Sequence, residues 1–256
     1  MSFLYDGTDG AFLLRIMDET SRRLSRTRCG VSDTSASEEK HPLLLTGQAL
    51  RRQAAENERR VCQWIMDTRS DPPPADPAAV RQQLFVLAEL TNTGLLPAGR
   101  LRTWEVPYPL RLPEDDGHLP SPRRRIPPAE LPQAIDAFCG TIHRRWGELS
   151  GDPTPLAAWA EWHLNPGPLH PFYDGCGRVS RSFAAMLLVR ASRLPPLYGS
   201  RETYFQHAER GPTALADYLR ACIADCAQWL GLESSSLECT IDRVSGEGHA
   251  PPHADA

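Results

Sequence analysis

The sequence predicts a mainly α-helical bundle with one small β-hairpin, and three observations support this prediction. Apolar residues recur at intervals of three and four in most segments between residues 46 and 230, which is the spacing of amphipathic helices. The 24 prolines cluster between these segments and separate them. Residues 101–112 differ, because apolar and polar residues alternate there as they do in a strand.

The N-terminal part contains two strong helical patterns. Residues 1–20 form a weakly amphipathic segment, and the polar residues 26–41 are typical of a loop. Residues 46–68 repeat apolar side chains at helical spacing. The segment "DPPPADPAAV" ends that pattern and begins the next, since proline is favoured in a first helical turn, and we expect this second helix to continue to Gly94.

The segment 101–112, "LRTWEVPYPLRL", is expected to form one arm of an edge hairpin. Pro107 and Pro109 interrupt it, and proline cannot donate a hydrogen bond to a neighbouring strand. The following "PEDDGHLPSPRRR" is typical of an exposed turn, and we expect its arginines at 123–125 to be solvated.

Four more helical patterns follow, in "IPPAELPQAIDAF", "LAAWAEWHL", "RSFAAMLLVRAS" and "ALADYLRACIADCAQWLG". Several large or sulfur-containing residues of these helices are expected to be core residues: Trp159, Trp162, Cys222, Cys226 and Trp229. From Ser245 onward the tail lacks apolar anchors, which predicts disorder. The expected organisation is a helical extension over 1–92, a core domain over 93–232 and a C-terminal tail over 233–256.

Composition and charge exclude several classes of protein. The net charge is −4, from 28 basic and 32 acidic residues, so no broad surface for nucleic acid or membrane is expected. Apolar runs such as "FAAMLLV" are too short to span a bilayer, and "MSFLYDGTDG" lacks the features of a signal peptide. Seven scattered cysteines fit free thiols, so we expect a cytoplasmic protein.

The stretch "HPFYDGCGRVSR", residues 170–181, combines groups that bind anions. Gly175 and Gly177 precede a helix expected to begin near Arg178. Glycine lets a ligand approach the main chain, and the free N–H groups of a first helical turn attract phosphate. Arg178 and Arg181 lie one turn apart, so both would lean over the same side of the helix.

Two further groups in this stretch suit transfer to a hydroxyl. Asp174 could hold Mg²⁺ between phosphate oxygens, and His170 is the natural general base, since histidine titrates near neutral pH. Each feature alone is more often structural, because a glycine turn is usually only a turn and a lone histidine usually belongs to the fold. Their joint presence within twelve residues favours a site for phosphoryl chemistry.

This stretch resembles the signature of the Fic (filamentation-induced-by-cAMP) family, H-P-F-x-x-G-N-G-R-x-x-R, often with an acidic residue before the first glycine. The matching residues are His170, Pro171, Phe172, Asp174, Gly175, Gly177, Arg178 and Arg181. His163 also lies seven residues before His170, as a histidine often does in the family. Residues 100–128 occupy the place of the family's hairpin flap, and the resemblance spans about 95 to 230.

The resemblance implies a helical fold and a Mg²⁺-dependent transferase, typically one that moves AMP from ATP to a protein hydroxyl. Other members transfer UMP, phosphocholine or phosphate, and the acceptor here could be a protein or a small molecule. His170 would be the general base and Asp174 would bind Mg²⁺. The nucleotide phosphates would contact Gly175, Cys176, Gly177, Arg178 and Arg181. The flap would hold an acceptor protein by strand addition.

The chain departs from the family pattern at two places near His170. Cys176 replaces the signature asparagine, whose amide helps to bind the α-phosphate in the family. A thiol is a weak donor, and one charge-assisted hydrogen bond is worth roughly 1.5–3 kcal/mol. The segment "NPGP" breaks the approach to His170, where the family usually continues a helix, and this would reshape the rim of the pocket.

A third departure concerns self-inhibition. In the family, a segment (S/T)xxxE(G/N) supplies a glutamate that pairs with the second signature arginine, here Arg181, and misplaces the γ-phosphate. "RQAAEN" offers Glu56 followed by Asn57, with Arg52 in the Ser/Thr position, and "SSSLEC" offers Glu238. Glu56 is the better positional candidate of the two for an inhibitory residue, although an ordinary solvated helix glutamate is the favoured interpretation of this position.

Three activities stay open at this point. The first is the Mg²⁺-dependent transferase, and the second is a nucleotide-binding module without turnover, which Cys176 motivates. In the third, Cys176 is itself the nucleophile, because a helix N-terminus beside two arginines favours a thiolate, and His170 is the acid–base group. A metal cluster of His163, His170, Asp174 and Cys176 is the least favoured interpretation.

Overall fold

The computed structural model describes residues 8–25, 47–95, 99–104, 125–173 and 175–231. The expected loop over 26–41, most of the hairpin segment 101–112 and the tail from Ser245 lie outside these residues. No helix in the described part is long and apolar enough to cross a membrane.

The described chain is mainly α-helical, as predicted. Its helices are α1 (Thr8–Ser25), α2 (Gly47–Asp67), α3 (Pro77–Asn92), α4 (Leu131–Arg145), α5 (Thr154–Leu164), α6 (Cys176–Arg190), α7 (Arg201–Glu209) and α8 (Pro212–Trp229), with short 3-10 helices η2 (Pro128–Glu130) and η3 (Trp146–Ser150). All the helical patterns of the sequence appear as helices. The pattern does not predict α7, a short polar helix whose N-terminus is capped by the Ser200 hydroxyl, which accepts from the Thr203 N–H at 3.2 Å.

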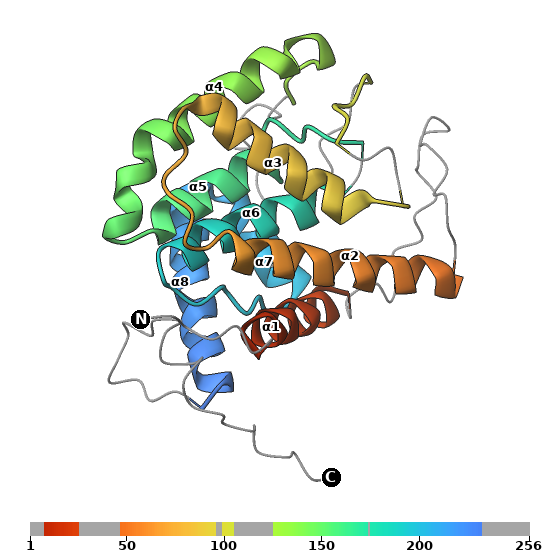
Figure 1. Cartoon of the computed structure of the whole chain (residues 1–256), viewed down its shortest axis with the longest axis vertical. Coiled ribbons are helices and arrows are strands. Elements are labelled where there is room, and N and C mark those ends of the chain that lie inside the picture. The colour runs from red at the N-terminus through yellow and green to blue at the C-terminus, as the bar shows by residue number, and fades with distance from the viewer. Residues whose placement is uncertain (1–7, 26–46, 96–98, 105–124, 174, 232–256) are drawn as a thin grey trace, which may run out of the picture.

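Helix α6 is the centre of the bundle (Figure 1). Eleven of its fifteen residues are buried, and α2, α3 and α5 all pack against it. Every residue from Ser182 to Val189 is buried, so this part of the helix needs neighbours on every side, which explains its position. The helix begins at Cys176, two residues before the expected Arg178, because Gly175 adopts the left-handed conformation (φ 74°) and α6 starts directly after it.

Helices α1 to α4 follow one another in space as they do in sequence, each packing on the next or on the core (Figure 1). Leu13, Val61 and Leu84 share one apolar cluster with Phe138 and Phe183. The expected division between residues 92 and 93 stays a prediction, although residues on both sides of it contribute to this single core.

The C-terminal helices complete the bundle. Helix α8 packs on α5 and α7, and its Cys222 and Cys226 are buried, as expected. The three tryptophans expected in the core lie at its margin, where Trp159, Trp162 and Trp229 are half-buried against three different apolar clusters. Their size makes full burial rare, so this position agrees with their chemistry.

Candidate active site

The loop that carries His170 connects α5 to α6 and has no regular secondary structure. His170 has a positive φ of 36°, which is uncommon for a residue other than glycine. Two residues later, Phe172 is only 2% exposed and its ring packs edge-on against Phe85 at 5.8 Å between centroids. Phe172 therefore anchors the loop to α3, as its apolar nature predicts.

The turn before α6 has room only for glycine at its first position. A Cβ atom built on Gly175 would lie 2.4 Å from the Oδ1 atom of Asn92, which is too close for any side chain. Asn92 is the last residue of α3 and is buried. The close approach places the end of α3 against the start of α6, so the N–H groups of the first α6 turn lie in a fixed position.

Cys176 closes this turn through its thiol. Its Sγ atom accepts from the Phe172 N–H at 3.3 Å and donates to the Phe172 carbonyl at 3.4 Å. The residue is 2% exposed. The side chain therefore faces its own loop, a position that supports neither a nucleophilic thiol nor a side-chain contact to phosphate. Its main chain still belongs to the first turn of α6.

The structure brings Arg178 and Arg181 together, as their spacing predicts. Both line a cavity of about 460 Å³ whose walls come mainly from α1, α2 and α6. Arg178 Nη2 donates to Asn92 Oδ1 at 3.5 Å, and the Arg181 guanidinium lies 5.9 Å from the ring centroid of Tyr198. His170 is not part of the lining of this cavity.

Glu58, on α2, lies in the same cavity as the two arginines. It is half-buried, and one of its carboxylate oxygens accepts from the Ser21 hydroxyl of α1 at 2.8 Å. Burial raises its pKa, and the nearby charges of Arg181 and Arg178 partly oppose that effect. An acidic side chain thus lies in the same cavity as the two arginines of the signature.

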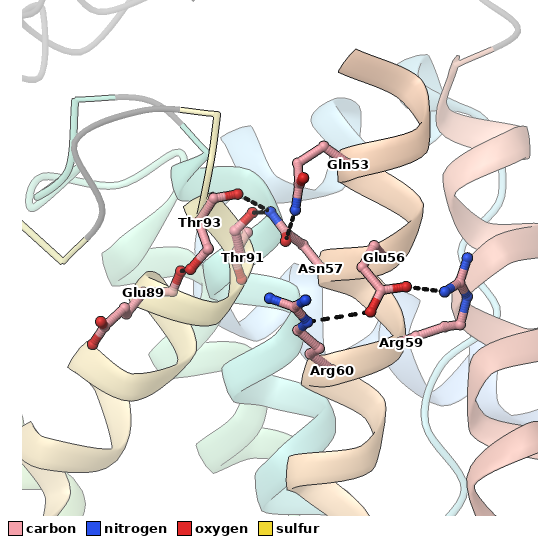
Figure 2. Close-up of polar contacts among 8 residues, drawn as sticks. All are labelled: Gln53, Glu56, Asn57, Arg59, Arg60, Glu89, Thr91 and Thr93. Atoms are coloured by element: carbon pink, nitrogen blue, oxygen red, sulfur yellow. Dashed lines mark hydrogen bonds and ion pairs between the residues drawn. The ribbon is translucent and has the colours of Figure 1, made fainter. Parts of the chain in front are cut away.

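Glu56, the positional candidate for an inhibitory residue, points to Arg59 and Arg60 of its own helix, as an ordinary solvated glutamate would (Figure 2). It forms ion pairs with Arg59 and with Arg60, the latter at 3.2 Å, on the outer surface of α2. Its neighbour Asn57 turns inward and donates to the Thr91 and Thr93 carbonyls at 3.1 and 2.8 Å. The structure therefore does not bring Glu56 to the two arginines. Glu56 and Glu58 are two positions apart on α2, and two positions along a helix lie on nearly opposite faces. Glu238 lies outside the described residues.

Two buried arginines hold the loop around His170. Arg102, 1% exposed, donates through Nε to the His170 carbonyl at 2.9 Å, and it also donates to the carbonyls of Trp104 and Ile126. Arg125, 5% exposed, donates to the Gly167 carbonyl at 2.9 Å. The expectation of a solvated loop at 123–125 is therefore wrong for Arg125. The buried loop has carbonyls that no helix satisfies, and these arginines supply the donors.

The charge of His170 depends on its burial and on these two arginines. Burial first, and then the positive charges of Arg125 and Arg102, lower the pKa of this histidine to about 3. Its Nδ1 atom is buried without a hydrogen-bond partner among the described residues. The imidazole is therefore neutral at physiological pH.

The metal predictions fall largely outside the described residues. Asp174, the expected Mg²⁺ ligand, is one of the residues that the structure leaves undescribed. Within the described part, no group of three or more His, Cys, Asp or Glu side chains is placed to hold a metal ion. The His163 ring instead makes a 2.8 Å hydrogen bond to the Trp159 carbonyl and packs against that tryptophan, which favours a structural role.

The start of the expected flap lies beside the His170 loop. Leu101 pairs with Phe172 in an antiparallel bridge, and the Arg102 N–H donates to the Pro171 carbonyl at 2.9 Å. The rings of Trp104 and Tyr173 are 4.3 Å apart. Residues 105–124 are outside the described part, so the hairpin stays a prediction.

Comparison with solved structures identifies the architecture. The chain is similar to a Fic-domain-containing signaling protein from Bacteroides thetaiotaomicron, with a TM-score of 0.52 at 15% identity over 94% of this chain and 91% of that one. The chain has a Fic-like fold. A Fic family protein from Desulfovibrio desulfuricans aligns with a TM-score of 0.49 at 16% identity over 96% of this chain and 78% of that one. No family model and no curated protein matches the sequence.

A buried carboxyl group that the sequence motif does not include lies near Arg181. Glu161 of α5 is 0% exposed and accepts from the Tyr198 hydroxyl at 2.5 Å. Burial raises its pKa to about 7, and the Tyr198 hydrogen bond and the Arg181 charge oppose this rise. Glu161 therefore links α5 to Tyr198, whose ring faces the Arg181 guanidinium.

Sequence reasoning missed several residues of this site, and most carry no readable signal. They are Glu58, Asn92, Arg102, Arg125 and Glu161. Only proximity in the folded chain brings them to the signature. The placement of a carboxylate within a run of apolar residues, as in "LAAWAEWHL", was the one available signal, since a charged residue on a buried helix needs a partner.

Replacing Arg102 by methionine should destabilise the protein by about 2–4 kcal/mol, because buried loop carbonyls would lose charged donors. Urea unfolding followed by tryptophan fluorescence measures this change. Arg100→Met is the matched control, since Arg100 is exposed and two positions away, and it should change the unfolding free energy by less than about 0.5 kcal/mol. Equal effects of the two substitutions would contradict the clamping role.

Glu161 should make stability fall as pH rises. The carboxyl of the unfolded chain loses its proton near the ordinary glutamate pKa of 4.5, whereas that of the folded chain keeps it until about pH 7. The unfolding free energy should therefore decrease by roughly 3 kcal/mol between these values and level off above pH 7. In Glu161→Gln this contribution is absent, so the difference between the two proteins in urea unfolding at pH 4.5 and 7.5 tests it. Parallel pH profiles would rule it out.

Proposed function

We propose that this protein transfers a nucleotidyl group, most simply AMP from ATP, or a related phosphoryl-linked group, to a hydroxyl of a protein or a small molecule. The observation that supports this best is a neutral His170 with a positive φ, in the loop that leads to the N-terminus of α6, whose first turns carry Arg178 and Arg181. Two further observations support the same assignment. The fold is Fic-like, and the resemblance of residues 170–181 to the Fic signature implies a transferase.

The residues at the start of α6 fit a polyphosphate. Gly175 exposes the main chain in a left-handed turn, the first turn of α6 has N–H groups that the helix itself does not use, and two guanidinium groups line the adjacent cavity. ATP would supply the activated phosphorus and Mg²⁺ would neutralise part of its charge. Asp174 is the residue to which we assign the Mg²⁺, by resemblance to the family.

His170 would act as the general base. Because Nδ1 is buried, we assign Nε2 as the atom that takes the proton from the acceptor hydroxyl. The low pKa of the free protein keeps the ring unprotonated, and the negative charge of a bound nucleotide would raise its basicity during the reaction. Arg102 donates a hydrogen bond to the His170 carbonyl and so holds the main chain of His170 in place.

His170→Ala should abolish labelling of the protein, or of an added acceptor, by ATP radiolabelled at the α-phosphate in the presence of Mg²⁺, because no other group takes the proton. The measurement is incorporated label together with intact mass, and His143→Ala on α4 is the matched control that should label normally. At nucleotide concentrations well below saturation, the wild-type rate should show no loss near pH 6.5, since the pKa of His170 in the free protein lies far below this value. Labelling that persists in His170→Ala would exclude this mechanism. If the wild-type protein binds ATP tightly but transfers no label, it is instead a nucleotide-binding module without turnover.

We also infer that Glu58 restrains this site. Its carboxylate shares the cavity with Arg178 and Arg181, and α1 fixes it there through Ser21. A carboxylate and a phosphate compete for the same guanidinium groups, and a like charge beside a bound phosphate weakens binding. Glu58 therefore has the position that the sequence pattern suggested for Glu56.

Glu58→Ala should strengthen ATP binding by about tenfold, equivalent to 1.4 kcal/mol, and raise the labelling rate, because it removes this competition. Isothermal titration of ATP with Mg²⁺ measures the affinity. Glu56→Ala removes a carboxylate from the same helix but from its outer face, so it should leave both quantities unchanged. If the two variants behave alike, the restraint does not come from Glu58.

A further inference from the structure

A second cavity lies at the opposite end of α6 from the signature. Its volume is about 440 Å³, which is enough for a small organic ligand. Its walls come from the end of α6, from η3 and from the segment that follows α2. Helix α6 has 15 residues, with the signature at its start and Arg190 at its end, so the rise of a helix separates the two places by roughly 20 Å. The cavity is therefore distinct from the candidate active site.

Arg190, in the wall of this cavity, has a buried guanidinium without a hydrogen bond. Its side chain is 4% exposed, and its Nε, Nη1 and Nη2 atoms have no hydrogen-bond partner within the described ranges. Asp71 forms an ion pair with it, but Oδ2 lies 3.7 Å from Nη2, which is too far for a hydrogen bond. The guanidinium carbon lies 5.6 Å from the centre of the Trp146 ring, a cation–π contact that supplies no acceptor oxygen. A buried cation with unused donors is costly, so we expect it to bind an anion.

The end of α6 is closed without the Arg190 guanidinium. An arginine in a last helical turn can donate to the free carbonyls there. Main-chain N–H groups already do this, since the Ser192 N–H donates to the Val189 carbonyl at 3.0 Å. The Arg193 N–H donates to the Leu188 carbonyl at 2.9 Å. Capping of α6 therefore does not explain why the guanidinium is buried.

The lining of the cavity suits a dianion that carries an organic group. Its charged residues are Arg69, Asp71, Arg190 and Arg193. Three positive charges and one negative charge give a net charge of +2. A phosphate monoester carries about two negative charges at neutral pH, and its oxygens match the donors of a guanidinium. The larger apolar residues of the cavity are Pro73, Trp146 and Leu149.

We propose that this cavity binds the phosphate monoester of a small organic molecule, whose phosphate oxygens take the place of Asp71 beside Arg190. The Asp71 side chain is 54% exposed, so its carboxylate can turn into solvent without being buried elsewhere. The half-buried Arg69 and Arg193 would add positive charge around the phosphate, and the apolar residues would contact the organic group. This site does not depend on the proposed function, so either of the two can fail alone.

The test is a titration of isotope-labelled protein with phenyl phosphate, followed through the indole N–H signal of Trp146 in nuclear magnetic resonance spectra. Trp146→Phe assigns the signal, which should shift and saturate in the wild type. Arg190→Met should weaken binding about tenfold or more, because a charged donor is lost. Arg210→Met, which removes an exposed arginine after α7, is the matched control and should bind as the wild type does.

Two further variants separate a ligand site from a structural ion pair. Asp71→Asn removes a competing anion, so it should strengthen phenyl phosphate binding severalfold without lowering the melting temperature. In a structural pair, Asp71→Asn would instead lower the melting temperature and leave the Trp146 signal unmoved by phenyl phosphate, which would overturn the proposal. His170→Ala should leave the shift of the Trp146 signal intact, because it acts at the other end of α6.

Two more probes define the ligand. Inorganic phosphate should bind more weakly than phenyl phosphate, because it lacks the organic group, and phenol should not shift the Trp146 signal. Equal affinities for the two phosphates would overturn the assignment of a monoester in favour of the free ion. A Trp146 signal that phenyl phosphate does not shift, or an Arg190→Met protein that binds as tightly as the wild type, would overturn the site itself.

Discussion

The candidate site depends on one constraint: the loop from α5 to α6 is buried but has no helix or strand to satisfy its main chain. Its carbonyls need donors, and the chain supplies them from far away in sequence, through Arg102 and Arg125. Phe172 and the Cys176 thiol fix the end of the loop. With the loop held in this way, His170 can keep a strained conformation within it.

The same arrangement determines the electrostatics of the site. Burial and the charges of two buried arginines lower the pKa of His170, and two more arginines, both on α6, line a nearby cavity. Two carboxyl groups that the signature does not include lie near these arginines on different helices, Glu161 on α5 and Glu58 on α2. The pKa of each is raised by burial, and the charge of Arg181 opposes that rise.

Much of the helical architecture could be predicted because apolar spacing and proline breaks are local signals. Helices α2, α3, α4, α5 and α8 appear close to their expected ranges, and α6 begins two residues early because the conformation of Gly175 decides its start. The polar helix α7 was missed, since it has no apolar stripe and depends on its Ser200 cap. The sequence also could not show that Glu58, and not Glu56, faces the arginines of α6, since residues two positions apart lie on nearly opposite faces of a helix.

By itself, the sequence determined the order of the helices and the signature at 170–181, because both are written in residues close together along the chain. Only the tertiary structure decided which side chains surround that signature. Burial assigned Arg125 to the loop carbonyls and Cys176 to the Phe172 main chain, and packing placed Asn92 of α3 against Gly175. These contacts join residues from separate helices, and their chemistry depends on distance and desolvation, which local sequence does not encode.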